Sequence, residues 1–367
     1  MEILRAKTST LFEGKPLTGE HLANSRLNTR EMEDGACELR SYPRRLVLEL
    51  TNRCNLNCVM CGRNSAHFKP TTLSMDTFRS LEPVMDHVEE VTLMGWGEPT
   101  VNPGFADMLH AIADHGARAY FCTNGMLLHK LADVILQTRV EVFAVSVDGA
   151  TQQSNARIRR GSDLGRICSS ISSILKEAAA RKQEPPWINF VFCAMRENIR
   201  ELPDVVRLAE RTGVPEVKVV YLTAFDETQA PSTLWGHEDE IREVVGQATA
   251  VAEQLGVALK LPYVPGEDPA GTAAHRPCYT PWRDFFLGSD GYVRPCMSTS
   301  QKLFKYDPRT PFLTMWNAPE FMELRAVVND ETRMPPQCQR CYQSSHCNWN
   351  LRSSFLQLGT NFSPDWE

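Results

Sequence analysis

A regular alternation of strand-like and helix-like segments between residues 45 and 222 is the strongest constraint on the fold. Short runs rich in apolar and β-branched residues predict strands at 45–51, 90–95, 118–123, 141–147, 187–194 and 216–222. Segments with helical spacing lie between or after them, at 73–88, 105–115, 127–137, 164–181 and 199–212. This alternation predicts an α/β fold with a parallel sheet and helices outside it. Periodicity alone leaves open whether the units close partly as a barrel or form an open, doubly wound sheet.

The rest of the chain divides into shorter regions. Residues 1–44 are polar and predict an N-terminal arm or subdomain. One more helix is predicted at 238–256, so the main domain is placed at 45–260. Residues 261–350 begin with a stretch rich in Pro and Gly and contain five cysteines, which predicts a small domain organised around metal. Residues 351–367 are predicted to form a C-terminal tail.

Composition narrows the compartment and the kinds of partner. The net charge is −6 and no strongly basic region is present, so a nucleic-acid partner is not expected. Charge-free apolar runs such as 142–147 are far shorter than the ~20 residues that span a membrane, so no membrane partner is expected. The first residues lack the apolar core of a secretory signal, and we therefore expect a cytoplasmic protein. In that reducing compartment, clustered cysteines among the 12 in the chain indicate metal sites rather than disulfides.

The first cysteine cluster follows the first predicted strand. Cys54, Cys58 and Cys61 have the spacing C-x3-C-x2-C on one short loop. Three thiolates can hold three irons of a cubane [4Fe-4S] cluster and leave the fourth iron open to another ligand. The alternative is a zinc knuckle, but structural zinc normally takes four ligands in paired C-x2-C units, and no fourth ligand with suitable spacing is nearby.

This loop resembles the cluster loop of the radical S-adenosylmethionine (SAM) enzymes, and four further segments agree with that family in order. Residues 95–99 (GWGEP) resemble its Gly-Gly-Glu-Pro motif, with Trp96 in place of one glycine. The segments 123–125 (TNG), 146–149 (SVDG) and 158–161 (IRRG) follow. The strand-end segments lie where parallel α/β folds place their ligands. One departure is Met60, where the family usually has an aromatic residue before the last cysteine.

The resemblance implies a fold, cofactors and roles for named residues. It implies a partial (β/α)6 barrel of the TIM type, with a [4Fe-4S] cluster on the three cysteines whose open iron binds SAM. It implies that Gly97 and Glu98 contact the SAM amino group, and that Ser146 and Arg159 contact its ribose or carboxylate. It also implies an external one-electron reductant, such as flavodoxin or ferredoxin, and a 5′-deoxyadenosyl radical that abstracts a substrate hydrogen.

A second cysteine cluster lies near the C-terminus. The segment 285–296 (FFLGSDGYVRPC) predicts a hairpin with its turn at Asp290-Gly291. This hairpin would bring Cys278 and Cys296 to one end. The other cysteines of the cluster are Cys338, Cys341 and Cys347. Four thiolates suit tetrahedral zinc as well as an iron–sulfur cluster, so the residues themselves leave both open.

Beside a radical SAM core, this pattern resembles the SPASM and twitch domains, which bind auxiliary iron–sulfur clusters. The full SPASM pattern continues past Cys347, but Leu351 stands where the next cysteine belongs. The resemblance therefore implies one auxiliary [4Fe-4S] cluster. Its ligands would be Cys278, Cys296, Cys338 and Cys341, with Cys347 either spare or a further ligand.

An auxiliary cluster that is fully ligated by protein can accept an electron. We therefore expect radical oxidation of a small polar metabolite, such as a sugar, an aminocyclitol or a nucleoside. Candidate general bases are Glu49, Lys218 and Tyr221. Epimerisation and decarboxylation are alternatives, and epimerisation needs a thiol hydrogen donor, for which the candidates are Cys193, Cys122 and Cys347.

Two further readings of the sequence use different substrates or none. SPASM relatives often modify peptides, so a peptide- or protein-modifying enzyme is the second hypothesis. The third is a non-enzymatic zinc- or cluster-binding interaction protein, against which the intact Cys54, Cys58, Cys61 and Glu98 argue.

Overall fold

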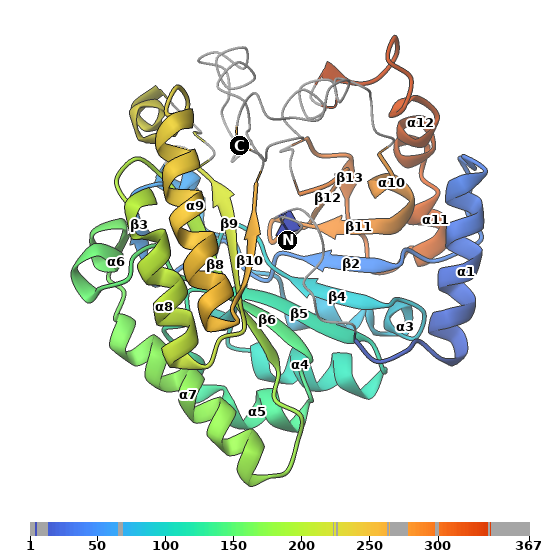
Figure 1. The fold of residues 1–367 in the computed structure, drawn as a ribbon. Helices are drawn as coiled ribbons and strands as arrows, with labels where there is room; N and C mark the ends of the chain where they lie inside the picture. Colours follow the sequence, from blue (N-terminus) through green and yellow to red (C-terminus); the bar gives the residue numbers. More distant parts are fainter. Residues whose placement is uncertain are drawn as a thin grey trace.

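The computed structural model describes residues 4–5, 14–64, 69–222, 224, 227–262, 264, 278–297, 301–336 and 338, and the structural statements below concern these residues. One large curved sheet forms the centre, with helices packed on its outer side (Figure 1). Its strands, within the described residues, are β1 (Leu4–Arg5), β2 (Arg45–Leu48), β4 (Glu90–Leu93), β5 (Arg118–Thr123), β6 (Val142–Ser146), β8 (Trp187–Ala194), β9 (Glu216–Tyr221), β10 (Ala258–Leu261), β11 (Asp284–Leu287), β12 (Tyr292–Arg294) and β13 (Phe304–Lys305).

The strands of this sheet are hydrogen-bonded in the order β1-β10-β9-β8-β6-β5-β4-β2-β11-β12-β13. All neighbouring pairs from β1 to β11 are parallel, and β12 and β13 continue antiparallel. The six expected strands are present and adjacent, so the α/β fold with a mostly parallel sheet is confirmed. A separate two-stranded sheet pairs β3 (Asn57–Cys58) with β7 (Arg159–Arg160).

The described helices are α1 (Gly19–Glu33), α2 (Met75–Arg79), α3 (Glu82–Met85), α4 (Phe105–Asp114), α5 (Ala132–Gln137), α6 (Gln152–Ile158), α7 (Leu164–Ala180), α8 (Leu202–Thr212), α9 (Glu238–Leu255), α10 (Thr280–Arg283), α11 (Phe312–Trp316) and α12 (Pro319–Val327). The helix expected at 73–88 is two short helices, because Pro83 has no amide hydrogen to continue the first one and instead opens α3. The helix expected at 127–137 begins with a 3-10 turn and becomes α-helical at Ala132. None of the helices within the described ranges is long and apolar enough to cross a membrane.

Alternation along the strands separates an apolar outer face from a polar inner face. On β5, the Phe121 ring packs edge-on against Phe105 of α4, with ring centroids 5.3 Å apart, so Phe121 faces the helices. Its neighbours Tyr120 and Cys122 therefore face the inner side. The same division holds across the sheet, because the side chains of residues paired between neighbouring parallel strands point to the same face. The inner face collects Thr92, Tyr120, Cys122, Ser146, Asn189, Cys193, Glu216, Lys218 and Lys260.

The C-terminal segment joins the large sheet directly. Strand β11 runs parallel to β2, and an ion pair joins the two strands, with Nη2 of Arg45 2.6 Å from Oδ2 of Asp284. The expected hairpin is present as β11 and β12. Phe285 of β11 packs against the rings of Trp316 and Phe321 in a buried aromatic cluster. The boundary between residues 260 and 261 remains a prediction.

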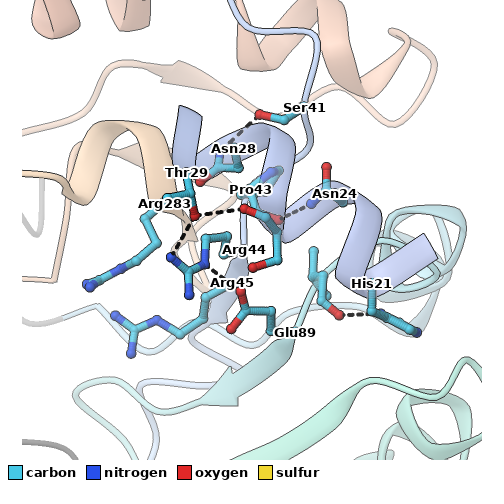
Figure 2. A network of polar contacts seen from close by, with 12 residues as sticks. His21, Asn24, Asn28, Thr29, Ser41, Pro43, Arg44, Arg45, Glu89 and Arg283 are labelled. Atoms are coloured by element: carbon cyan, nitrogen blue, oxygen red, sulfur yellow. Dashed lines mark hydrogen bonds and ion pairs between the residues drawn. The ribbon is translucent and has the colours of Figure 1, made fainter. Parts of the chain in front are cut away.

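Helix α1, which the sequence pattern did not predict, fastens the N-terminal region to both parts of the molecule (Figure 2). The side chain of Asn28 donates to the hydroxyl of Ser41 at 3.0 Å and to the carbonyl of Trp282 at 2.8 Å. Asn24 donates to the carbonyl of His87 at 3.1 Å, next to the strand β4. Buried amides of this kind are stable only with partners, so these bonds fix the helix in place.

Candidate functional site

The three cysteines of the first cluster lie on the loop that follows β2. Cys58 is in β3, where its register partner is Arg159 of β7, and the amide of Val59 donates to the carbonyl of Ile158 at 3.0 Å. The amide of Cys61 donates to the carbonyl of Cys58 at 3.2 Å, which turns the chain between these two cysteines. The loop is therefore held against the segment that contains Arg159, at the carboxyl edge of the sheet.

The thiols of this loop are partly buried and have hydrogen-bond donors and cations beside them. The Cys54 sulfur accepts the amide hydrogen of Leu56 at 3.4 Å and an amide hydrogen of Asn124 at 3.6 Å. Burial raises the pKa of the Cys54 thiol, while Arg63 partly offsets that rise. Burial also raises the pKa of Cys58 to about 11, and Arg159 partly offsets it.

The donor chemistry of this environment fits an iron–sulfur cluster. In a cubane cluster each cysteine binds a different iron, so the thiols need not converge on one point. Soft thiolate donors with nearby hydrogen-bond donors and cations are the environment that such a cluster prefers. Cys54, Cys58 and Cys61 would hold it.

The GWGEP loop after β4 packs directly on the cysteine loop. The amide of Glu98 donates to the carbonyl of Arg53 at 2.8 Å. A Cβ atom at Gly97 would clash with the carbonyl oxygens of Thr51 and Arg53. Glycine at this position thus allows the two backbones to touch, which fixes the distance between the motif and the cluster loop.

The Glu98 carboxylate is used inside the protein. It is 2% exposed, and it accepts hydrogen bonds from the hydroxyls of Thr100 at 2.6 Å and Thr123 at 2.7 Å and from the amide of Asn124 at 2.6 Å. Burial raises the pKa of this carboxyl, and the accepted hydrogen bonds offset part of the rise. The side chain links the ends of β4 and β5, and its expected contact with the SAM amino group remains a prediction.

Ser146 and Arg159 both lie near the thiol of Cys122. Ser146 ends β6, and its hydroxyl is 3.6 Å from the Cys122 sulfur on β5. Nε of Arg159 is 2.6 Å from Oδ2 of the fully buried Asp148. Burial opposes the charged form of Arg159, but Asp148 outweighs that effect and keeps the pKa above its usual value. Arg159 therefore offers a fixed positive charge beside Cys58.

Two thiols that are candidate hydrogen donors lie on the inner face. Burial raises the pKa of both Cys122 and Cys193, so both are protonated thiols at neutral pH. The backbone amide of Cys193 donates to the Asp148 carboxylate at 2.7 Å. A thiol that donates a hydrogen atom must be in the S–H form, so burial keeps both candidates in the form that this role would need. The third candidate, Cys347, lies outside the described residues.

The three candidate bases occupy different positions. Glu49 is buried, and its carboxylate accepts from the amide of Trp96 at 2.7 Å and from the hydroxyl of Ser289 at 2.6 Å, so it joins the GWGEP loop to the β11–β12 turn. Lys218 is on the inner face. Tyr221, three residues later on β9, faces the opposite side and is buried in the main hydrophobic core.

The C-terminal cysteines are only partly described. Cys278 and Asn329 are joined by two hydrogen bonds between the side chain of Asn329 and the backbone of Cys278, at 2.7 and 3.2 Å. Cys296 follows β12, and Cys338 lies at the end of the described chain. Cys341 lies outside the described residues, so the ligand set of an auxiliary cluster remains a prediction.

Several site residues were not identified from the sequence. Asn124 and Asp148 stood within the TNG and SVDG segments, and their positions there were the available signal. Asn189 had no such signal, because it belongs to an apolar strand pattern whose facing depends on the sheet. Lys260 lies in β10, a strand that the sequence analysis did not predict.

Comparison with known proteins agrees with this geometry. The chain matches the family model of the radical SAM superfamily over residues 48–209 and the SPASM iron–sulfur cluster-binding domain over residues 278–342. It is 25% identical over 222 residues to a tungsten-containing aldehyde ferredoxin oxidoreductase cofactor-modifying protein of Pyrococcus furiosus, covering 59% of this chain and 62% of that protein. It is 30% identical over 173 residues to the mycofactocin maturase MftC of Mycobacterium ulcerans, covering 46% of this chain and 44% of that protein.

Solved structures show the same fold at lower identity. The crystal structure of Streptococcus suis SuiB matches with a TM-score of 0.62 and 16% identity, over 83% of this chain and 72% of that one. The match therefore extends beyond the barrel. Together, the two family models, the cysteine loop at the carboxyl edge and the shared fold show that this chain belongs to the radical SAM superfamily of enzymes and has a C-terminal SPASM iron–sulfur cluster-binding domain.

Proposed function

We propose that this chain is a SAM-dependent radical oxidase that acts on a small polar metabolite, such as a sugar, an aminocyclitol or a nucleoside. The observation that supports it is the polar inner face, which begins at the cysteine loop and lies beside a SPASM segment joined to β2. When bound, the first cluster and SAM supply a radical that takes a hydrogen atom from the substrate, and an auxiliary cluster supplies an acceptor for the second electron.

The residues of this chain would bind and orient the reactants. Cys54, Cys58 and Cys61 would ligate the first cluster. Ser146 and Arg159 lie on the inner side of the same edge, where they would hold the polar groups of SAM, with Arg159 kept charged by Asp148. Glu98 and Gly97 would act by fixing the loop that faces SAM. The apolar outer face of the sheet is packed in the main hydrophobic core, which excludes water from that side of the sheet.

The proposal is tested by following hydrogen from substrate to SAM fragment. The anaerobically reconstituted chain is incubated with SAM, dithionite and deuterated sugars, aminocyclitols or nucleosides. Deuterium in 5′-deoxyadenosine together with a substrate product two hydrogens lighter is expected. The Cys58→Ala variant is expected to form neither product. A product in which one deuterium is replaced by hydrogen, with no second hydrogen lost, would instead indicate epimerisation, with Cys122 or Cys193 as the hydrogen donor, and loss of carbon dioxide would indicate decarboxylation.

Peptide modification is a second candidate function, and specific relatives favour it. The 30% identical mycobacterial relative is a maturase, and SuiB has been crystallised with its precursor peptide SuiA. Oxidation of one residue within a peptide would use the same cluster loop and inner face. Deuterium transfer to 5′-deoxyadenosine from deuterated peptides, and not from deuterated metabolites, would select this function over the first.

A further inference from the structure

Two lysines lie side by side on the inner face of the sheet. Lys218 of β9 and Lys260 of β10 are register partners in adjacent parallel strands, so their side chains leave the same face. Val217 and Val219 alternate with Lys218 and are buried in the main hydrophobic core, which places Lys218 on the opposite, inner side. Lys260 is 1% exposed.

The ammonium group of Lys260 has no hydrogen-bond partner among the described residues. The side-chain amide of Asn189, which is fully buried one register layer away, also lacks partners for both of its polar atoms within the described chain. Burying such groups without partners is costly, and two adjacent ammonium groups also repel each other. Burial and the neighbouring Lys260 both lower the pKa of Lys218, as expected for this crowding.

The nearby charges leave this cluster with a net positive charge. Glu216, two residues before Lys218 on the same face, is the carboxylate that acts on both lysines, and it also accepts a hydrogen bond from the indole of Trp187 at 3.2 Å. Arg159 is already matched by Asp148. Two lysines against one carboxylate make a single excess positive charge, which suits a monoanion better than a dianionic phosphate.

We propose that Lys218 and Lys260 bind a carboxylate group of the substrate. This inference rests on the proposed function and names the substrate class more closely: a polar molecule or peptide that carries a carboxylate. The site is well placed for it, because Ser146, Val191, Lys218 and Lys260 form one register layer across β6, β8, β9 and β10. A carboxylate there would lie level with Ser146, the expected SAM contact, and would anchor the substrate near the radical.

The test uses binding, so that it does not depend on turnover. The full, reconstituted chain is saturated with SAM and treated with an amine-reactive ester, and acylation of each lysine is followed by mass spectrometry. The half-buried Lys218 is the reporter, and the exposed Lys176 of α7 is the internal control. The probes are N-acetyl-aspartate amide, its isosteric asparagine analogue, N-acetyl-alanine and inorganic phosphate, with calorimetric titration as a second measurement.

We expect a carboxylate probe to slow acylation of Lys218 by about tenfold relative to the asparagine analogue, while Lys176 is unaffected. Protection by N-acetyl-aspartate amide would indicate a side-chain carboxylate, and protection by N-acetyl-alanine alone would indicate a terminal one. Lys260→Met should abolish protection, and Lys260→Arg, which keeps the charge, should retain it.

Protection by the asparagine analogue as strong as that by the aspartate probe would overturn the proposal, as would protection by neither carboxylate probe or protection that survives in Lys260→Met. Protection by phosphate without protection by any carboxylate would also overturn it. These outcomes are separate from failure of the proposed function, because a chain that binds carboxylate but forms no 5′-deoxyadenosine would retain the anion site and lose the radical chemistry.

Discussion

At the scale of single residues, buried polar side chains with defined hydrogen-bond partners hold the loops together at the carboxyl edge of the sheet. Glu98 accepts hydrogen bonds from Thr100, Thr123 and Asn124, and Asn124 in turn donates to the Cys54 sulfur at 3.6 Å. The Glu98 carboxylate of the GWGEP motif is thus connected to Cys54, a proposed cluster ligand, through one intermediate residue. Changes at Glu98 should therefore reach the cluster as well as SAM.

Glu98→Gln replaces one acceptor oxygen with an NH2 group, which can only donate hydrogen bonds. One of the donors now facing Glu98 then loses its acceptor, which should destabilise the chain by about 1–3 kcal/mol. Urea unfolding measures this loss, and equilibrium dialysis should show weaker SAM binding. Glu253→Gln, on the exposed side of α9, is the matched control and should change neither quantity. Unchanged unfolding in Glu98→Gln would contradict the observed network.

Lys218 gives a pH-dependent prediction. Its pKa is lower in the folded chain than in the unfolded chain, so the unfolded state binds this proton more tightly. The destabilisation of the folded chain by the charged Lys218 is therefore fully present below the lowered pKa. It disappears as pH rises towards ~10.4, the pKa of a lysine in the unfolded chain. Lys218→Met should be more stable than wild type at neutral pH, and the difference should shrink as pH rises through that window.

Urea unfolding of both chains between neutral and alkaline pH measures this difference. Lys176→Met, on the exposed face of α7, is the control, and its free energy of unfolding should follow that of wild type at every pH. A constant difference between Lys218→Met and wild type across the alkaline range would show that burial does not shift this lysine.

At the scale of elements, loops from separate strands meet through backbone contacts. The GWGEP loop rests on residues 51–53 through Gly97 and the Glu98 amide. Glu49 then connects the same loop to Ser289 in the turn between β11 and β12. The cluster loop, the motif loop and the SPASM hairpin thus form one connected unit at the carboxyl edge.

Gly97→Ala should separate the motif loop from the cysteine loop, because its Cβ would clash with two carbonyl oxygens. We expect a loss of about 1–3 kcal/mol in unfolding free energy, together with weaker SAM binding. Gly246→Ala is the matched control. Gly246 lies in the middle of α9 with open space around a Cβ, so alanine there should stabilise the chain by about 0.5–1 kcal/mol. Normal SAM binding by Gly97→Ala would refute the contact.

At the scale of the whole molecule, the SPASM segment and the barrel share one sheet. Strand β11 pairs with β2, the strand that leads into the cysteine loop, and α1 spans from β4 to Trp282 through Asn24 and Asn28.

Iron analysis after anaerobic reconstitution tests the division of cysteines. Two cubane clusters predict about eight irons per chain, falling to about four in the Cys54/Cys58/Cys61→Ala variant. Zinc is measured in the same samples. About four irons with one zinc in wild type, and no iron in the variant, would make the C-terminal site structural zinc and would remove the electron acceptor of the proposed oxidase.

The sequence by itself determined where the six parallel strands lie along the chain and showed the C-x3-C-x2-C loop, because apolar runs and short-range motifs are local properties. It did not determine which side of the sheet each strand residue faces. Lys218 and Tyr221 were equal candidates until alternation from the packed outer face separated them.

Tertiary structure alone decided the contacts between distant segments. The pairing of β11 with β2 joins residues more than 200 positions apart, and the Lys218–Lys260 pair arises from the register of β9 and β10. Such contacts depend on how the strands align in space, and no local pattern encodes that alignment. The cluster loop was therefore readable in the amino-acid order, whereas the chemistry of the surface it faces emerged only when the strands were assembled.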